Sequence, residues 1–180
     1  MRFAWVFIVF LLWANLAWSK KTWLNCNRDL NKQIQRAKSG DVLRANQECL
    51  FTVKKAIKIK KKLKIRNIRV RLKDGVGLTP IFKVLAEGVV IQNFVLYGNR
   101  KTVSQADRMS LILVFRSKCT IRNGVFVGAT QNGVLVRPSD KGKEIVGGRF
   151  ENLVGRGCVR DVVSISTRDA GRLKSRNIVV

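Results

Sequence analysis

Basic side chains are the chemically active groups that this sequence supplies in quantity. Its 180 residues include 36 Lys and Arg, 11 Asp and Glu and no His, which gives a formal net charge of +25. Such an excess of positive charge favours polyanionic partners. The absence of His excludes the commonest general base, the commonest metal ligand and every His-dependent catalytic triad.

The densest group of bases lies between Lys54 and Lys73. These twenty residues include eleven Lys or Arg and no acid. Bases alternate with apolar residues, a period of two that predicts strands with one buried face and one basic face. The alternative to binding is a solvated face that keeps the end of the domain soluble, but such a face usually mixes both signs of charge. The candidate substrate-binding residues are Lys58, Lys60, Arg69 and Arg71.

A corner motif recurs along the chain and predicts a repeat architecture. In Gly88–Asn99, two short apolar runs meet at Asn93, a residue type that tolerates the left-handed conformation of a sharp bend. The period is loose but is typical of stacked repeats, and about three strands per repeat with no convincing helix predict an all-β coil of parallel strands. We assign the corners, at separations of 26, 30, 24 and 30 residues, to Asn67, Asn93, Asn123, Gly147 and Asn177.

A second strand recurs in phase with the corner and brings candidate catalytic residues into register. At separations of 23 and 29 residues, we align Leu111–Val114, Val134–Arg137 and Val163–Ser166, with Ile81–Val84 heading the series. In this alignment Arg108, Gln131 and Arg160 share one column. Asn132 lies beside Asp161, and Arg137 lies beside Ser166. Solvated surface charge is the alternative for the arginines. The candidate catalytic residues are Arg108, Arg137, Arg160 and Asp161.

Two turn carboxylates form the candidate metal site. Asp140 and Asp169 share a column on adjacent coils of the same alignment, which predicts a separation of about 5 Å. Carboxylates at that distance either share a proton or hold a cation, so Ca²⁺ is a candidate cofactor, although the sequence establishes none with certainty. The alternative is two turn residues that point into water.

The N-terminus resembles a secretory signal. Arg2 precedes the apolar run Phe3–Trp13, and small residues at Ala17 and Ser19 predict cleavage before Lys20. An uncleaved anchor is the alternative, but it needs about 20 apolar residues. We therefore expect residues 1–19 to be a signal peptide, the only segment to meet a membrane, and the protein to be secreted or in the cell envelope.

Four cysteines remain after the predicted cleavage: Cys26, Cys49, Cys119 and Cys158. An oxidising compartment permits two bridges, with three possible connectivities. A bridge between Cys26 and Cys49 would tie the first helix to the first coil. Cys119 and Cys158 either form a second bridge or are free thiols that face the core.

One short helix is predicted near the start of the mature chain. Asn25 or Asn27 can cap it, and it ends at Ser39-Gly40. Its apolar stripe, formed by Leu30, Ile34 and Ala37, would cover the open end of a stack of coils. We assign residues 20–53 to this cap and a first strand, and residues 54–180 to coils that we expect to be incomplete at the C-terminus.

The segment Ala37-Lys38-Ser39-Gly40-Asp41-Val42-Leu43 and the Asn corners that follow it resemble the pectate-lyase-like superfamily. The resemblance covers roughly Cys26 to Val180 and implies a right-handed parallel β-helix. That superfamily includes polysaccharide lyases, polygalacturonate hydrolases, uronan epimerases and phage tailspikes, so it implies at most a substrate class. Arg160-Asp161 is similar to the polygalacturonase segment with two adjacent aspartates, but Arg160 replaces the first aspartate, which disfavours a hydrolase.

The resemblance and the charge together suggest an acidic polysaccharide as the partner. In a lyase or an epimerase, arginines would neutralise a uronate carboxylate while Arg, Lys or Tyr removes the neighbouring proton. The alternative is a basic β-helix without catalysis that binds a polyanionic wall or surface polymer. Nucleic-acid binding is disfavoured by the lack of stacking aromatics and by the predicted secretion. Catalysis and oligomeric state are left open.

Overall fold

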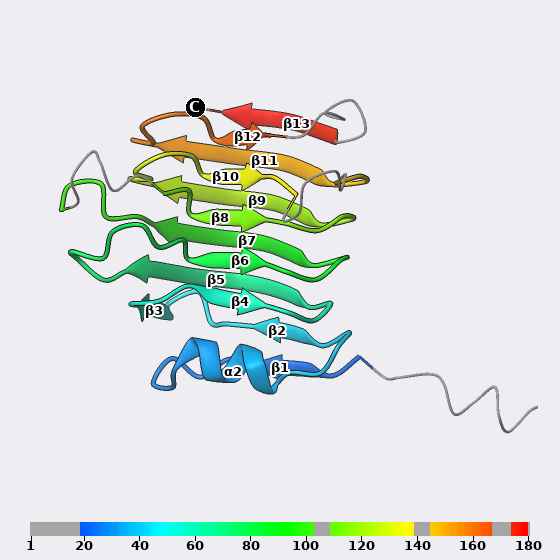
Figure 1. The fold of residues 1–180 in the computed structure, drawn as a ribbon. Coiled ribbons are helices and arrows are strands. Elements are labelled where there is room, and N and C mark those ends of the chain that lie inside the picture. The colour runs from blue at the N-terminus through cyan, green and yellow to red at the C-terminus, as the bar shows by residue number, and fades with distance from the viewer. Residues whose placement is uncertain (1–18, 103–108, 139–144, 167–173, 180) are drawn as a thin grey trace, which may run out of the picture.

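The computed structural model describes residues 19–102, 109–138, 145–166 and 174–179. Within these ranges the chain is a β-solenoid whose coils lie one on another, as predicted (Figure 1). Residues 1–18 of the predicted signal peptide lie outside the described residues. So do Arg108, Asp140 and Asp169.

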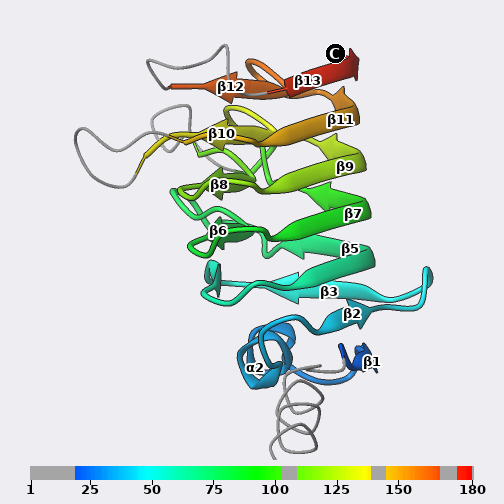
Figure 2. The same cartoon turned by 90° about the vertical axis from the view of Figure 1, so that its right-hand side faces the viewer.

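Two sheets form the walls of the solenoid, and all their strand pairings are parallel (Figures 1 and 2). Sheet A is stacked in the order β1 (Lys21–Trp23), β2 (Val42–Arg44), β5 (Lys64–Leu72), β7 (Val90–Tyr97), β9 (Thr120–Val127), β11 (Arg149–Arg156) and β13 (Lys174–Val179), and β3 (Leu50–Val53) also pairs with β5. Sheet B is stacked in the order β4 (Ile57–Ile59), β6 (Phe82–Val84), β8 (Ile112–Val114), β10 (Val134–Val136) and β12 (Val163–Ile165). From β3 onward the chain alternates between the two sheets, and it winds in a right-handed sense.

An asparagine in the left-handed conformation bends the long strands of sheet A. Asn67, Asn93 and Asn123 have φ angles of 55°, 54° and 51°, which confirms the predicted corners. Their side-chain amides form a ladder: Asn93 Nδ2 donates to Asn67 Oδ1 and Asn123 Nδ2 donates to Asn93 Oδ1, each at 3.2 Å. The ladder joins one coil to the next at the bend.

The next corner is Asn152, and the prediction of Gly147 is wrong. The pairing of Phe150 with Ile121 aligns Asn152 with Asn123, and Asn152 Nδ2 donates to Asn123 Oδ1 at 2.9 Å. Gly147 also has a positive φ angle, 66°, but it lies in the turn that precedes β11. Two residue types that accept the same backbone conformation occur in one coil, and the strand pairing decides which one is the corner.

The alignment in sheet B also differs by one residue from the predicted alignment. Val134 pairs with Ile112 and not with Leu111. Val134 pairs with Val163, as predicted. Gln131 is therefore aligned with Met109 and not with Arg108.

Inward-facing side chains of successive coils stack into apolar columns that form the core. One column of sheet A, in which no side chain is more than 1% exposed, consists of Ile65, Ile91, Ile121 and Phe150. The fit between coils is close at Gly124, where an added Cβ would lie 2.0 Å from Cζ of its register partner Phe94. The Phe94 ring therefore requires a glycine on the next coil.

The helix α2 (Leu30–Arg36) lies at the N-terminal end of the stack, the position predicted for a cap (Figure 1). Leu30 and Ile34 are buried in the core cluster. The N-cap is Asp29, whose side chain accepts a hydrogen bond from the Lys32 amide at 2.8 Å, so the predicted caps Asn25 and Asn27 are wrong. No helix within the described ranges has the length and apolar character needed to cross a membrane.

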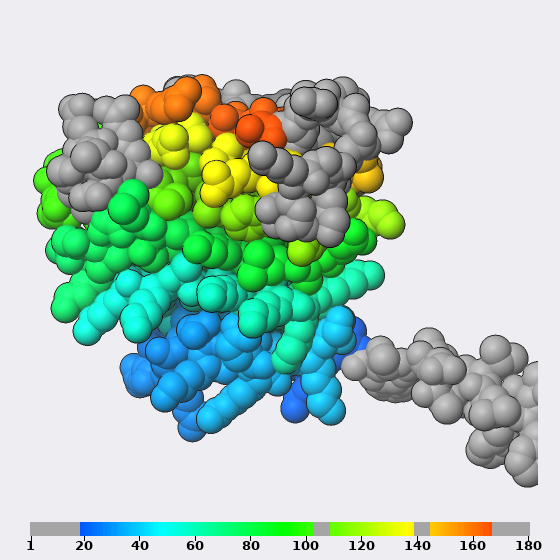
Figure 3. All heavy atoms as spheres, viewed as in Figure 1, coloured from blue at the N-terminus to red at the C-terminus, as the bar shows by residue number. Residues whose placement is uncertain are grey.

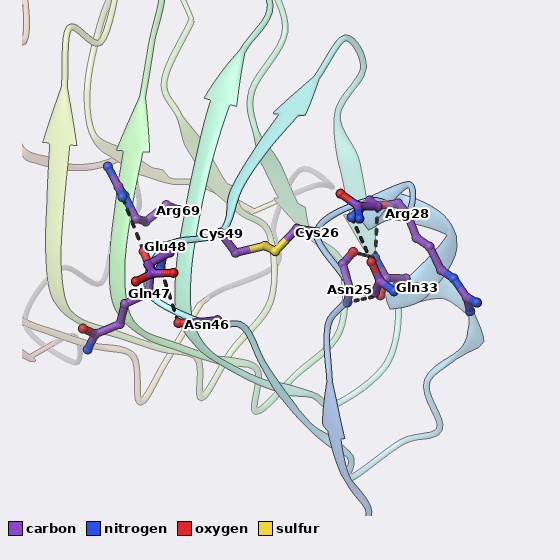
Figure 4. Close-up of a disulfide and its surroundings, with 10 residues drawn as sticks. Asn25, Cys26, Arg28, Gln33, Asn46, Gln47, Glu48, Cys49 and Arg69 are labelled. Atoms are coloured by element: carbon purple, nitrogen blue, oxygen red, sulfur yellow. Dashed lines mark hydrogen bonds between the residues drawn. A yellow bond between two sulfur atoms is a disulfide. The ribbon is translucent and has the colours of Figure 1, made fainter.

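The disulfide between Cys26 and Cys49 joins the segment before α2 to the loop between β2 and β3 (Figure 4). Cys119 and Cys158 are free thiols. Burial raises the pKa of Cys119 to about 11. At neutral pH this thiol is therefore protonated and serves as a core residue, not as a nucleophile.

Candidate polyanion-binding surface

Two of the described carboxylates accept hydrogen bonds from backbone amides. Asp29 caps α2, and Asp41 Oδ2 accepts a hydrogen bond from the Lys38 amide at 2.8 Å. In the part of the chain that the structure describes, neither Arg71 nor Lys58 forms an ion pair. Arg71 and Lys58 are therefore available to a ligand.

Arg69, Arg71 and Tyr97 meet on the outer face of sheet A. After the corner at Asn67, alternate residues of β5 face the core, so Arg69 and Arg71 face outward. Tyr97 is the register partner of Arg71 on the next strand. The Cζ atoms of Arg69 and Arg71 lie 6.0 Å and 5.6 Å from the centroid of the Tyr97 ring. One aromatic ring thus contacts two guanidinium groups, an arrangement stabilised by cation–π attraction.

Hydrogen bonds fix the position of Arg69 between the ring and the disulfide loop. Arg69 Nη2 donates to the Tyr97 hydroxyl oxygen at 3.1 Å. Arg69 Nη1 points toward the backbone carbonyl of Gln47, at 3.4 Å, in the loop that Cys49 anchors (Figure 4). The guanidinium is therefore oriented before any ligand binds.

A depression of about 650 Å³ opens beside Tyr97. Four of its lining residues are cations, and Asp74 is the acid among the lining residues. Arg71 and Arg156 are exposed, and Arg100 Nη1 donates to the Gly157 carbonyl at 2.9 Å. We call this site the Tyr97 depression, and its lining residues are Arg71, Asp74, Tyr97, Gly98, Asn99, Arg100, Lys101, Thr102, Val127, Gly128, Arg156 and Gly157.

The other two predicted substrate-binding residues lie on a different wall. Lys58 is in β4 of sheet B, where it pairs with Lys83 of β6, and Lys60 follows β4 directly. They line a second depression, of about 460 Å³, with Lys55 and Lys83. In Figure 3, which views the molecule as in Figure 1, the cyan and teal coils project elongated side chains beside the blue N-terminal end. The four predicted residues therefore belong to two separate surfaces.

The structure does not bring the predicted catalytic residues together. Arg160 and Asp161 precede β12 at the start of the sheet B strands, whereas Arg137 follows β10 at their end. Six residues of extended chain, about 20 Å, separate these two levels. Arg137 contacts Phe115 instead, with Cζ 5.6 Å from the ring centroid. The predicted proximity of Asn132 to Asp161 is confirmed, since the Asn132 side-chain oxygen accepts from the Asp161 amide at 3.2 Å.

The predicted metal pair, Asp140 and Asp169, lies outside the described residues. Among the residues that the structure does describe, no group of three or more His, Cys, Asp and Glu side chains is arranged to hold a metal ion. The site of any Ca²⁺ therefore stays a prediction.

Sequence reasoning missed Tyr97, Arg100 and Arg156. Tyr97 lies 26 residues after Arg71, the same separation as that of the corners Asn67 and Asn93. The period of the corners could therefore have placed this tyrosine beside Arg71. Arg156 ends β11 in the same register, since it pairs with Val127, which pairs with Tyr97, so the wrong corner at Gly147 concealed it. Arg100 lies in a turn and carries no such signal.

The solenoid was also compared with known proteins. No family model matches the chain, and no curated protein or solved structure matches it. The chemistry of the surface is therefore the guide to function.

Proposed function

We propose that this chain is a secreted or cell-envelope β-helix of the pectate-lyase-like superfamily that binds an acidic polysaccharide at the Tyr97 depression. One observation carries the proposal: the Tyr97 ring lies among exposed and half-exposed cations that form no ion pairs with described carboxylates. The excess of positive charge over the whole chain supports it.

The depression combines two kinds of contact that an acidic sugar needs. A guanidinium donates two parallel hydrogen bonds to a carboxylate, which a lysine ammonium cannot do. The Tyr97 ring offers an apolar face with a polar tip for a sugar ring. A nucleic acid is a poorer fit, because binding of single strands usually uses several aromatic platforms in succession.

The test is a binding titration with polygalacturonate at several salt concentrations. Affinity should fall steeply with salt, since the contacts are charged and exposed. The double variant Arg71→Ala/Arg156→Ala should lose at least about tenfold in affinity, or about 1.4 kcal/mol. The matched control is Lys58→Ala/Lys60→Ala, which removes the same two charges from sheet B and should lose less than about threefold. Equal losses in the two variants would show that net charge, and not the Tyr97 depression, determines binding.

A second candidate function is β-elimination or epimerisation of the same polymer, favoured by the hydrogen bond between Arg69 and the Tyr97 hydroxyl. Arg71 would neutralise the uronate carboxylate, and the Tyr97 oxygen, which accepts a hydrogen bond from Arg69, would take the proton from C5. In elimination the C5–H electron pair forms the C4=C5 double bond, the C4–O bond breaks, and the leaving oxygen takes the proton that Tyr97 removed from C5. In epimerisation a proton returns to C5 from the opposite face.

Elimination is tested by ultraviolet absorbance, because its unsaturated uronate product absorbs. Wild type should produce absorbance from polygalacturonate or alginate, and Tyr97→Phe should abolish it while it retains binding. No absorbance change with and without Ca²⁺ would exclude elimination of these polymers. Binding by a protein without this activity would leave standing the non-catalytic function and epimerisation, which forms no double bond.

A further inference from the structure

A second cationic surface lies on sheet A, before the asparagine corner along each strand. Trp23, Arg44 and Arg66 are register partners on β1, β2 and β5. The same register continues through Gln92 and Arg122 to Glu151, whose side chain is buried. The residues that precede Arg44 and Arg66 are buried in the core, so these side chains face outward. We call Trp23, Arg44, Arg66, Gln92 and Arg122 the arginine column.

The guanidinium groups of the arginine column share the same unsatisfied donor. The Nε atoms of Arg44, Arg66 and Arg122 are buried and have no hydrogen-bond partner. Arg122 Nη2 donates to Gln92 Oε1 at 3.0 Å, but among the described residues no carboxylate pairs with Arg44 or Arg66. A buried N–H without an acceptor is costly. Because Glu151 is the register partner of Arg122, the donors that lie away from any described carboxylate in the column, and that an oxyanion would satisfy, are those of Arg44 and Arg66.

The spacing of these donors suits a polymer better than a small ion. Nε–H and one Nη–H of a guanidinium donate together to two oxygens of a carboxylate. Arg44 and Arg66 lie on adjacent strands, about 4.8 Å apart, and Arg122 lies two strands beyond Arg66. Anionic groups that repeat along the solenoid axis would meet these guanidiniums in turn.

Trp23 adds an aromatic surface to the end of the arginine column. It lies on β1, and 67% of its surface is exposed. An indole can stack on a sugar ring, and the exposed Trp23 ring is open to such a contact. Charge and aromatic contact thus occur on one face, as they do at the Tyr97 depression.

We propose that the arginine column is a second binding subsite, for a linear polymer of carboxylated sugars that runs along the solenoid axis. Carboxylates bind Arg44 and Arg66, and a sugar ring stacks on Trp23. The guanidiniums turn outward from the sheet as they bind, which exposes Nε. The ligand class rests on the proposed function. The Tyr97 depression and the arginine column share no residue, so an experiment can refute one site and leave the other standing.

Tryptophan emission tests this subsite in the full chain titrated with an oligogalacturonate. Of the four tryptophans, three lie in the predicted signal peptide, so Trp23 is the tryptophan of the mature chain, and Trp23→Phe gives the background emission. We expect a Trp23-dependent emission change in wild type and at least a tenfold weaker midpoint in Arg44→Ala/Arg66→Ala. Arg71→Ala/Arg156→Ala, which removes the same charge elsewhere, should retain the amplitude of the change.

A charge-conserving variant keeps the test decisive if the alanine variant does not fold. Arg44→Lys/Arg66→Lys retains both charges but removes the guanidinium edge that donates two hydrogen bonds. It should raise the midpoint concentration of oligogalacturonate at least threefold. Thermal unfolding of the variant shows whether it is folded. No Trp23-dependent change, or wild-type affinity in this lysine variant, would overturn the proposal. If only Arg71→Ala/Arg156→Ala loses binding, the Tyr97 depression stands and the arginine column does not.

Two further ligands test the chemical class. Dextran sulfate should bind with a smaller Trp23 response than oligogalacturonate at equal salt, and an equal response would overturn the carboxylate assignment. Oligothymidine that binds more tightly than oligogalacturonate would overturn the assignment to a polysaccharide and favour a nucleic acid.

Discussion

The two sheets present different cations to the solvent. The cations on the outer face of sheet A are mainly arginines, whereas the first two strands of sheet B carry Lys58 and Lys83. Next along the same column of sheet B are Leu113 and Leu135, so its cations are confined to one end. A guanidinium recognises the shape of a carboxylate, whereas an ammonium is a mobile point charge. Under the proposed function, we therefore expect recognition at sheet A and a supporting, solubilising role for the lysines of sheet B.

The sheets also differ in how they pack. The strands of sheet B have three residues each, and the long strands of sheet A bend at an asparagine in their middle. The bend requires residues of particular shape, such as Gly124 opposite Phe94. The proposed recognition surface therefore lies on the sheet whose geometry depends most on single residues.

The largest expected effect is loss of stability when sheet A is overpacked. Gly124→Ala places a Cβ within 2.0 Å of the Phe94 ring, and it should lower the free energy of unfolding by about 3 kcal/mol. Urea unfolding measures the change. Combining it with Phe94→Leu should recover much of the loss, because the two residues contact each other. Val125→Ala, on the outward side of the same strand, is the control, and a similar loss there would contradict the packing argument.

The second largest expected effect is the loss of stability when the disulfide is removed. Cys26 and Cys49 are 23 residues apart, so replacing both with Ser should cost about 3 kcal/mol of stability. Because the bridge anchors the loop whose Gln47 carbonyl faces Arg69, polygalacturonate binding at the Tyr97 depression should weaken as well. Cys158→Ser, which alters a free thiol, should change neither property, and a wild-type melting curve for the double variant would refute the prediction.

A smaller effect is expected at the asparagine corner. Asn93 has a φ angle of 54° and hydrogen bonds to the corners on both sides. Asn93→Ala strains the backbone and breaks the ladder, so it should cost about 1–2 kcal/mol in urea unfolding. Asn93→Gly accepts the conformation and should cost less. If Gly and Ala destabilise equally, the corner conformation is not what asparagine contributes.

The smallest expected effect is a change in polygalacturonate affinity that distinguishes arginine from lysine. Arg71→Lys retains the charge on sheet A but loses the planar edge, so polygalacturonate affinity should fall about fivefold, or about 1 kcal/mol. Lys58→Arg on sheet B makes the opposite exchange, and the affinity should change less than about twofold. Titrations of both variants at one salt concentration measure these changes. Equal changes in affinity would mean that arginine and lysine contribute alike to binding on the two sheets.

Much of the fold could be predicted because its signals are local. Alternation of apolar and basic residues predicted strands, and Asn93 predicted the bend, since asparagine tolerates the left-handed conformation whatever surrounds it. The corner at Asn152 was missed for the opposite reason. Gly147 satisfies the same local requirement, and only the pairing of β11 with β9 distinguishes the two. The sheet B alignment failed by one residue because turns of unequal length separate its strands.

By itself, the sequence determined that the chain is a strongly basic, all-β repeat without histidine, because composition and period need no knowledge of neighbours in space. Only the tertiary structure decided that Arg69 and Arg71 face Tyr97 while Lys58 and Lys60 face away on another sheet. The physical reason is that period two shows that a residue points outward, but the winding of each coil decides which wall it points from.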